Sequence, residues 1–234
     1  MGWAKGDGVF SLRERIEALG GKPAIADVAK ESRKMADAAR QARLVVAAAR
    51  HLKPGQTALV TIELGTNDLC YQPKTAAATF ETHFRSAMAI LKDGLPRGSH
   101  ILVMSVPDLA HIHDIIAADR STRLYFAEAR NAERCAPFAG AGGRVSYSTA
   151  VALMDADNQA LSNVCGEVEA SLGPSDALHC TSDIPGLAER DFTIADISKA
   201  DHFHFAFSGQ NKMAEAAWAH LPWAALPIPA AARR

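Results

Sequence analysis

Two near-continuous apolar runs stand out along the chain. TALVTIEL covers residues 57–64 and stops at Gly65, and HILVMSV covers residues 100–106 and stops at Pro107. Runs of this kind are typical of strands that are buried on both faces of a parallel sheet. A shorter apolar segment, AIADV at 24–28, indicates a further strand. These segments predict a sheet of mainly parallel strands.

Hydrophobic positions recur with the period of an α-helix between and around these runs. Gly20-Gly21 and Pro54-Gly55 end the first two such segments, and Ser208 is placed to cap the last one. Because strands and helices alternate, the pattern predicts an α/β layered fold. No repeat or linker divides the chain, so we expect residues 1–234 to form a single domain. The expected helices cover 9–19, 33–52, 75–92, 121–135, 147–171 and 208–220, and 173–205 reads as irregular.

Composition narrows the functional class. The 234 residues carry a net charge of −1, and 48% of them are hydrophobic. This balance is typical of a globular protein and lacks the basic surplus of a nucleic-acid binder, so we expect no nucleic-acid partner. No apolar run approaches the roughly 20 residues of a membrane span. The N-terminal MGWAKGDG shows no signal-peptide pattern.

The loops that follow the two apolar runs are candidates for chemistry, because open parallel sheets bind ligands beyond the carboxyl ends of their strands. The first loop reads Gly65-Thr66-Asn67-Asp68. Glycine allows close backbone approach, and an asparagine amide can donate to a developing oxyanion. The ordinary alternative is a turn in which Asn and Asp bond their own backbone.

A second candidate group lies near the C-terminus, in Asp201-His202-Phe203-His204. An aspartate three residues before a histidine can orient the imidazole and stabilise its cation, so that the histidine acts as a general base. A solvated Asp-His loop is the alternative interpretation.

Histidine pairs in this chain also raise the question of a metal. Imidazole and carboxylate are zinc ligands, but alternate residues of a strand share a face without any metal. We therefore expect neither a metal nor another cofactor. The residues concerned are His111, His113, His179, Asp196, Asp201, His202 and His204.

Together, Gly-x-Asn-Asp after a central strand and Asp-x-x-His before the last helix resemble the SGNH (GDSL-type) hydrolases. LGTNDLC, the 95–108 run that ends in SVPD, and FHFAFSGQ at 203–210 are similar to the secreted bacterial branch. The similarity covers most of residues 2–222. It implies a three-layer α/β sandwich around a mainly parallel sheet. It also implies that Asn67 and Gly65 form the oxyanion hole and that Asp201 and His204 belong to the catalytic triad.

One block of that family has no counterpart here. The family opens with a strand ending in Gly-Asp-Ser, whose serine is the nucleophile, whereas Gly6-Asp7-Gly8 lacks the serine and a preceding apolar run. We expect that the chain starts downstream of this block and that its sheet lacks the first strand, which favours a homo-oligomer. In the family's next block, a glycine donates its backbone N–H to the oxyanion, and Ser32 aligns with this glycine. A hydroxyl at this position would lie close to the substrate carbonyl, so Ser32 is the candidate nucleophile. The alternative for Ser32 is a helix N-cap, and Ser11 is a second candidate nucleophile.

The four cysteines, Cys70, Cys135, Cys165 and Cys180, form no CxxC pair. Their number alone allows three pairings or four free thiols. The resemblance implies the pairs Cys70–Cys135 and Cys165–Cys180. It also implies that the natural parent is secreted or periplasmic.

The expected function is therefore that of a serine esterase, a carboxylic ester hydrolase that acts on small, short-acyl or aryl esters through an acyl-enzyme. The alternative is a catalytically inactive protein of the same fold that binds a carbohydrate or lipid ligand. The expected partner in the first case is a small ester substrate.

Overall fold

The computed structural model describes residues 2–6, 8–71, 75–128, 135–138, 145–171, 178–184 and 191–229. Its sheet consists of three parallel strands in the order β1 (Leu59–Ile62), β2 (Ser99–Val103) and β3 (Leu178–Ser182). The register pairs Leu59 with His100 and His100 with His179. The predicted α/β fold with a mainly parallel sheet is confirmed.

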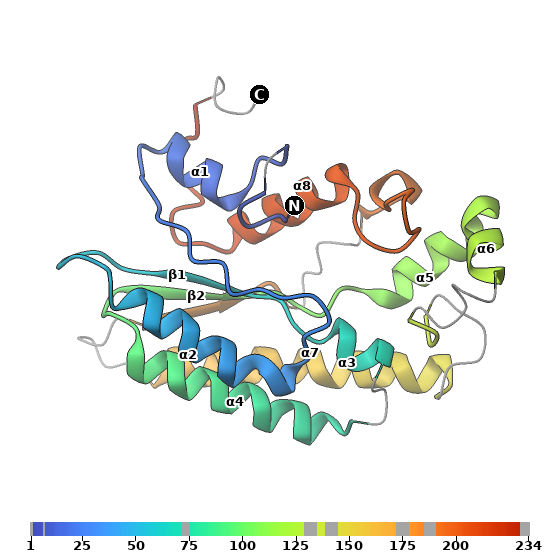
Figure 1. The fold of residues 1–234 in the computed structure, drawn as a ribbon, viewed down its shortest axis with the longest axis horizontal. Helices are drawn as coiled ribbons and strands as arrows, with labels where there is room; N and C mark the ends of the chain where they lie inside the picture. Colours follow the sequence, from blue (N-terminus) through green and yellow to red (C-terminus); the bar gives the residue numbers. More distant parts are fainter. Residues whose placement is uncertain are drawn as a thin grey trace.

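Helices cover both faces of this sheet (Figure 1). They are α1 (Leu12–Ala18), α2 (Ala38–Ala49), α3 (Thr66–Tyr71), α4 (Ala77–Gly94), α5 (Leu109–Ala118), α6 (Arg120–Ala127), α7 (Tyr147–Ala170) and α8 (Phe207–Ala219), with the 3-10 turns η1 (Met35–Asp37) and η3 (Ile194–Asp196). Helices α2, α4 and α7 lie on one face, and α1 and α8 lie on the other.

Strand β2 forms the centre of the core because both of its faces are covered. All five of its residues are buried. Ile101 and Val103 pack into the cluster that α2, α4 and α7 share, whereas Leu102 and Met104 pack into the cluster formed with α1 and α8. This alternation follows from the two-residue period of a strand.

Strand β1 lies at the edge of the described sheet. Val60 is fully buried and the other three residues are half-buried. Val60 and Ile62 pack into one core cluster and Leu59 into the other, so both faces are covered, but less completely than predicted. The reason is that β1 has a hydrogen-bonded neighbour on one side only.

The strand expected at 24–28 is wrong, since residues 21–30 have no regular secondary structure and are mostly exposed. Near β1, the N-terminal segment makes a different contact: the indole N–H of Trp3 donates to Glu63, the residue that follows β1.

Several elements differ from the sequence-based expectation. Strand β3 lies inside the stretch that was expected to be irregular, because only Leu178 and Cys180 of this short strand are fully buried and they give a weak apolar signal. Helix α5 follows Pro107 without being expected, and the Asp108 side chain caps it by accepting the His111 N–H. Ser208 does not cap α8: Ala206 is the N-cap residue, and the Ser208 hydroxyl donates to the carbonyl of Ala195 at 3.0 Å.

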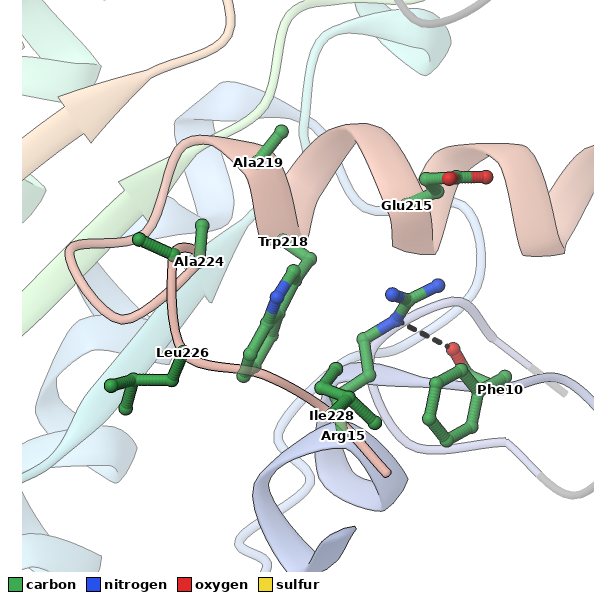
Figure 2. A pocket seen from close by; sticks show the side chains of 9 residues that line it. Phe10, Arg15, Glu215, Trp218, Ala219, Ala224, Leu226 and Ile228 are labelled. Atoms are coloured by element: carbon green, nitrogen blue, oxygen red, sulfur yellow. Dashed lines mark hydrogen bonds between the residues drawn. The ribbon is translucent and has the colours of Figure 1, made fainter. Parts of the chain in front are cut away.

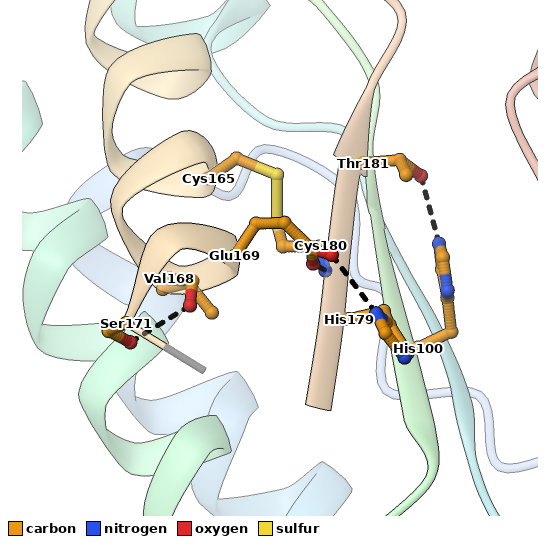
Figure 3. The surroundings of a disulfide bond; sticks show 8 residues. All are labelled: His100, Cys165, Val168, Glu169, Ser171, His179, Cys180 and Thr181. Carbon is orange, nitrogen blue, oxygen red and sulfur yellow. Dashed lines mark hydrogen bonds and ion pairs between the residues drawn. A yellow bond between two sulfur atoms is a disulfide. The ribbon is translucent and has the colours of Figure 1, made fainter. Parts of the chain in front are cut away.

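Two disulfides form in the pairing that the resemblance implied. Cys70–Cys135 joins α3 to the 135–138 segment, and Cys165–Cys180 joins α7 to β3 (Figure 3). The second bond therefore ties a helix of one layer directly to the edge of the sheet. None of the described helices combines the length and the hydropathy that a bilayer span requires.

Candidate active site

Gly65 fixes the point where the loops after β1 and β2 touch. Its φ is +130°, and a Cβ built there would lie 2.3 Å from Cγ2 of Val106. A side chain at this position would therefore be strained and would collide with its neighbour. Val106 is in turn held by the buried side chain of Asn158 on α7. The Val106 N–H donates to Oδ1 at 2.7 Å, and Nδ2 donates to the Val106 carbonyl at 3.1 Å.

Asn67 and Asp68 follow in the first turn of α3 and bind residues 33 and 35, at the start of η1. Asn67 Nδ2 donates to the carbonyl of Arg33 at 3.0 Å. Asp68 Oδ2 accepts the N–H of Met35 at 2.9 Å, in a buried position. One N–H of the Asn67 amide is thus used to orient the side chain, and the amide has a second N–H that can serve a ligand.

Ser32 lies next to this segment in a left-handed conformation. Its φ is +60°, and the residue is exposed in a turn with Glu31. Ser32 is not a helix N-cap, since Lys34 precedes η1 and Asp37 precedes α2. A positive φ favours glycine, which agrees with the alignment of Ser32 on a glycine.

Ser11, the second candidate nucleophile, has a structural role. It is the N-cap of α1 and forms a capping box with Glu14. Its side chain is fully buried, and its hydroxyl donates to Glu14 Oε2 at 3.2 Å. A buried cap is not available to attack a substrate.

Asp201 and His204 form a hydrogen-bonded pair just before α8. Asp201 Oδ2 lies 2.5 Å from His204 Nδ1, while Asp201 Oδ1 accepts the N–H groups of Phe203 and His204 at 3.2 and 3.1 Å. Burial raises the pKa of Asp201, but the hydrogen bonds from His204 and Phe203 outweigh it and hold the pKa below its ordinary value. The carboxylate therefore stays ionised at neutral pH, and its hydrogen bond to Nδ1 fixes the orientation of the imidazole ring.

The loop that carries this pair is anchored on both sides. The Ser198 N–H donates to the His204 carbonyl at 2.7 Å, and the His202 N–H donates to the Ser198 carbonyl at 2.8 Å. His202 Nδ1 lies 3.0 Å from the Thr122 hydroxyl, and its ring lies 4.6 Å from that of Tyr125. The His204 side chain is 77% exposed. Its Nε2 has no hydrogen-bond partner in the described part of the chain, so this nitrogen is open to a substrate.

The structure thus brings together Asp201 with His204 and places Gly65 beside Asn67. Both groups lie toward the end of the molecule where α3, α5 and the segment before α8 are found (Figure 1). Within the described residues no hydrogen bond joins Ser32 or Asn67 to His204. The complete constellation of nucleophile, base and oxyanion hole therefore remains a prediction.

Two buried carboxyl groups near these loops were not identified from the sequence. Asp183 directly follows β3 and accepts both the N–H and the hydroxyl of Ser105, at 2.7 and 3.0 Å. Asp157 lies in the middle of α7 and is only 4% exposed. The available signal for Asp157 was its helical spacing: the residues three and four positions before and after it are all apolar and share its face of the helix.

The histidines considered as metal ligands have other contacts. His111 Nε2 lies 3.2 Å from the carbonyl of Phe192, and His113 Nδ1 is bonded to the carbonyl of Phe138. Across the ranges that the structure describes, no group of three or more His, Cys, Asp or Glu residues has the geometry to hold a metal ion.

A cavity of about 560 Å³ lies between α1, α8 and the segment that follows α8 (Figure 2). Trp218, Leu226 and Ile228 form much of its wall. Arg15 lies beside it, with Nε donating to the carbonyl of Phe10 at 3.0 Å. The cavity is at the C-terminal half of α8, whereas Asp201 and His204 precede the N-terminus of this helix, so it is separate from the candidate active site.

A comparison with curated proteins finds no match for this chain. A comparison with family models does find one. The family of GDSL-like lipases and acylhydrolases matches residues 13–217, which include Ser32, Gly65, Asn67, Asp201 and His204. Because the match covers most of the 234 residues, the chain belongs to the GDSL-like lipase/acylhydrolase family.

Proposed function

We propose that the protein is a serine esterase that hydrolyses small, short-acyl or aryl esters through an acyl-enzyme. His204 Nε2 takes the proton of the Ser32 hydroxyl, whose oxygen attacks the ester carbonyl. Asn67 Nδ2 and the Gly65 N–H donate to the oxyanion of the tetrahedral intermediate. The intermediate collapses and expels the alcohol, which takes the proton from the His204 imidazolium. A water molecule, deprotonated by His204, then releases the acid from Ser32.

The Asp201–His204 pair is the observation that carries this proposal. The carboxylate binds Nδ1 and leaves Nε2 exposed, which is the arrangement that a general base needs. Family membership supports a general hydrolase activity.

Nucleophile labelling tests the proposal directly. The folded protein would be treated with a fluorophosphonate, and the modified peptide would be identified by mass spectrometry. We expect the label on Ser32, its loss in Ser32→Ala, and a strong reduction in His204→Ala. Ser11→Ala serves as the matched control and should label like the parent protein if it still folds. A label that persists in Ser32→Ala contradicts the assignment of the nucleophile.

Hydrolysis of nitrophenyl esters of increasing acyl length tests the substrate class. We expect the highest kcat/KM on the shortest acyl chains. Asn67→Ala should lower kcat by roughly 10²–10³-fold, as the loss of one oxyanion donor does elsewhere. A higher kcat/KM on long-chain than on short-chain esters would contradict the proposed substrate class.

A catalytically inactive protein that binds a carbohydrate or lipid ligand is the second candidate function. It is favoured by one observation: among the described residues, Ser32 makes no hydrogen bond with His204. A folded protein that neither takes up the fluorophosphonate nor hydrolyses any ester would favour this second function.

The proposal also includes export of the natural parent to an oxidising compartment. The two disulfides support it, because such bonds persist outside the reducing cytosol. Free-thiol titration of protein isolated from its native source tests this part: no free thiol is expected, and four would contradict it.

Self-association is the last part of the proposal. The outer edge of β1 supports it, because unpaired strand edges are sites where another chain can add. Size-exclusion chromatography with light scattering would show a mass above 24.9 kDa if the chain associates, and a monomer at all concentrations would contradict this.

A further inference from the structure

Asp157 is a deeply buried acidic residue. It lies in the middle of α7, is 4% exposed, and its Oδ1 is removed from solvent without any partner. Among the described residues, the Asp157 side chain forms no hydrogen bond and no ion pair. Burying an ionised carboxylate without a partner is very unfavourable, so such a group takes up a proton instead.

Asp68 is the charged neighbour of Asp157. It lies on α3, which packs against α7, and it is 5% exposed. Burial raises the pKa of Asp157 to about 7, and the negative charge of Asp68 adds to this effect. Burial also raises the pKa of Asp68, although the Met35 N–H and the charges of Lys34 and His83 oppose it. Two buried carboxyl groups whose negative charges repel each other share one proton, and they do not both ionise.

One member of this pair, Asp68, is the next residue after the candidate oxyanion donor Asn67. Asp68 follows Asn67 in α3 and holds the Met35 N–H, while Asn67 holds the Arg33 carbonyl. An ionised Asp68 is the better acceptor for Met35. It can remain ionised in this buried position as long as Asp157 is neutral. A second negative charge on Asp157 would repel Asp68 and disturb the short turn to which both α3 side chains are bonded.

We propose that Asp157 is a positioning residue for the Asn67 loop. By retaining one proton beside Asp68, it keeps the Asp68–Met35 bond and the orientation of the Asn67 amide, and loss of this proton at alkaline pH turns the amide away. The consequence for catalysis rests on the proposed function: kcat/KM then declines on the alkaline side. In the described part of the chain, the positive charges that act on Asp68 come from Lys34 before η1 and His83 on α4.

The NMR signals of the Asn67 side-chain amide test this positioning role directly, and the measurement does not require the protein to be catalytically active. Its two N–H signals would be followed by ¹⁵N NMR from pH 5 to pH 9, with assignment by Asn67→Ala. We expect a shift with a midpoint near pH 7 in the parent protein. Asp157→Asn, which has the same shape and carries no charge, should abolish the shift. Asp155→Asn is the matched control, because Asp155 is exposed on the same helix, and should behave like the parent.

His83 could produce a similar shift, and His83→Gln separates the two sources. The shift should persist in His83→Gln if Asp157 causes it. A shift that persists in Asp157→Asn, or disappears in His83→Gln, overturns the proposal. A parent protein whose Asn67 signals stay constant across this range overturns it as well, whether or not any variant folds.

Stability provides a second readout. Because the folded state holds the proton more tightly than the unfolded state, stability decreases as pH rises from about 4 to about 7. The difference between the ordinary value of 3.8 and about 7 corresponds to a roughly 1000-fold change in the unfolding equilibrium constant. Asp157→Asn should lose most of this dependence in urea titrations at several pH values. An unchanged dependence contradicts the assignment of the proton to Asp157.

Kinetics separates this inference from the proposed function. If the protein hydrolyses esters, Asp157→Asn should retain kcat/KM at pH 6 and lose the alkaline decline. A decline that is identical in the parent and in Asp157→Asn overturns the positioning role. If no ester is hydrolysed, only the proposed function fails, and the Asn67 amide signals still decide the inference.

Discussion

The Asp201 carboxylate lies 2.5 Å from Nδ1 of His204, three residues further along the chain. The same carboxylate accepts two backbone N–H groups of its own turn, so its position does not depend on the imidazole. We therefore expect Asp201→Asn to leave the turn largely intact but to lose the charge that stabilises the imidazolium. The expected loss in kcat is roughly 10⁴-fold, as for the Asp→Asn change in another catalytic triad. Ester hydrolysis measured at saturating substrate checks it.

Asp93→Asn is the control for this substitution, because Asp93 is exposed on α4 and should show parental kinetics. Thermal unfolding of both variants would show that any loss is catalytic. An Asp201→Asn protein with the kcat of the parent would remove Asp201 from the proposed triad.

Gly65→Ala should destabilise the protein and lower its activity. A methyl group would lie 2.3 Å from Val106 Cγ2, on a backbone with φ of +130°. Strain and overpacking together predict a loss of about 2–4 kcal/mol in the free energy of unfolding. Gly166→Ala is the matched control, because Gly166 lies in α7 with open space around its Cα. That change should be neutral or stabilise the protein by up to about 1 kcal/mol. Urea unfolding of both variants measures the difference, and equal stabilities would contradict the geometry.

Removal of the Cys165–Cys180 bond should cost less stability than removal of Cys70–Cys135. The separations are 15 and 65 residues. On the chain-entropy estimate, the two bonds contribute about 3 and about 4 kcal/mol. Double Cys→Ser variants, compared by urea unfolding without reductant, test the order. The reverse order would show that native-state contacts around α7 and β3, rather than loop closure, dominate.

His100 should make the protein sensitive to acid. Its ring is stacked on that of His179 at 6.0 Å, and its Nε2 lies 2.9 Å from the Thr181 hydroxyl (Figure 3). Burial lowers the pKa of His100 below its ordinary value of 6.5, and the positive charge of His179 adds to this, while Glu169 opposes it. A lowered pKa means that the unfolded state takes up the proton first, so stability is lost as pH falls below about 6.5.

His100→Gln should flatten this loss in unfolding experiments between pH 7 and pH 4.5. His51→Gln is the control, since His51 is exposed in the turn after α2, and should follow the parent. An acid-induced loss that is as steep in His100→Gln as in the parent would assign the effect to other groups.

The chain by itself determined the local features of the candidate site. Two apolar runs identified β1 and β2, and the i, i+3 spacing of Asp201 and His204 is enough for their hydrogen bond, because residues this close along the chain can meet within one turn. Helix α7 was predicted almost to the residue, since its 24 residues carry a long apolar period. The disulfide partners came from resemblance to the family, whereas Asn67 was a candidate oxyanion donor from its position after a buried strand, and the resemblance added to this.

Tertiary structure decided everything that depends on partners distant in sequence. The incomplete burial of β1 follows from the lack of a second neighbouring strand in the described sheet, and β3 exists because β2 pairs with a segment too short to show a pattern of its own. Ser11 became a buried cap, and Asp157 came to lie near Asp68, because packing of whole helices sets which side chains meet. Burial and nearby charges change the pKa and the reactivity of a side chain. Both depend on residues distant in sequence, so they exist only in the folded chain.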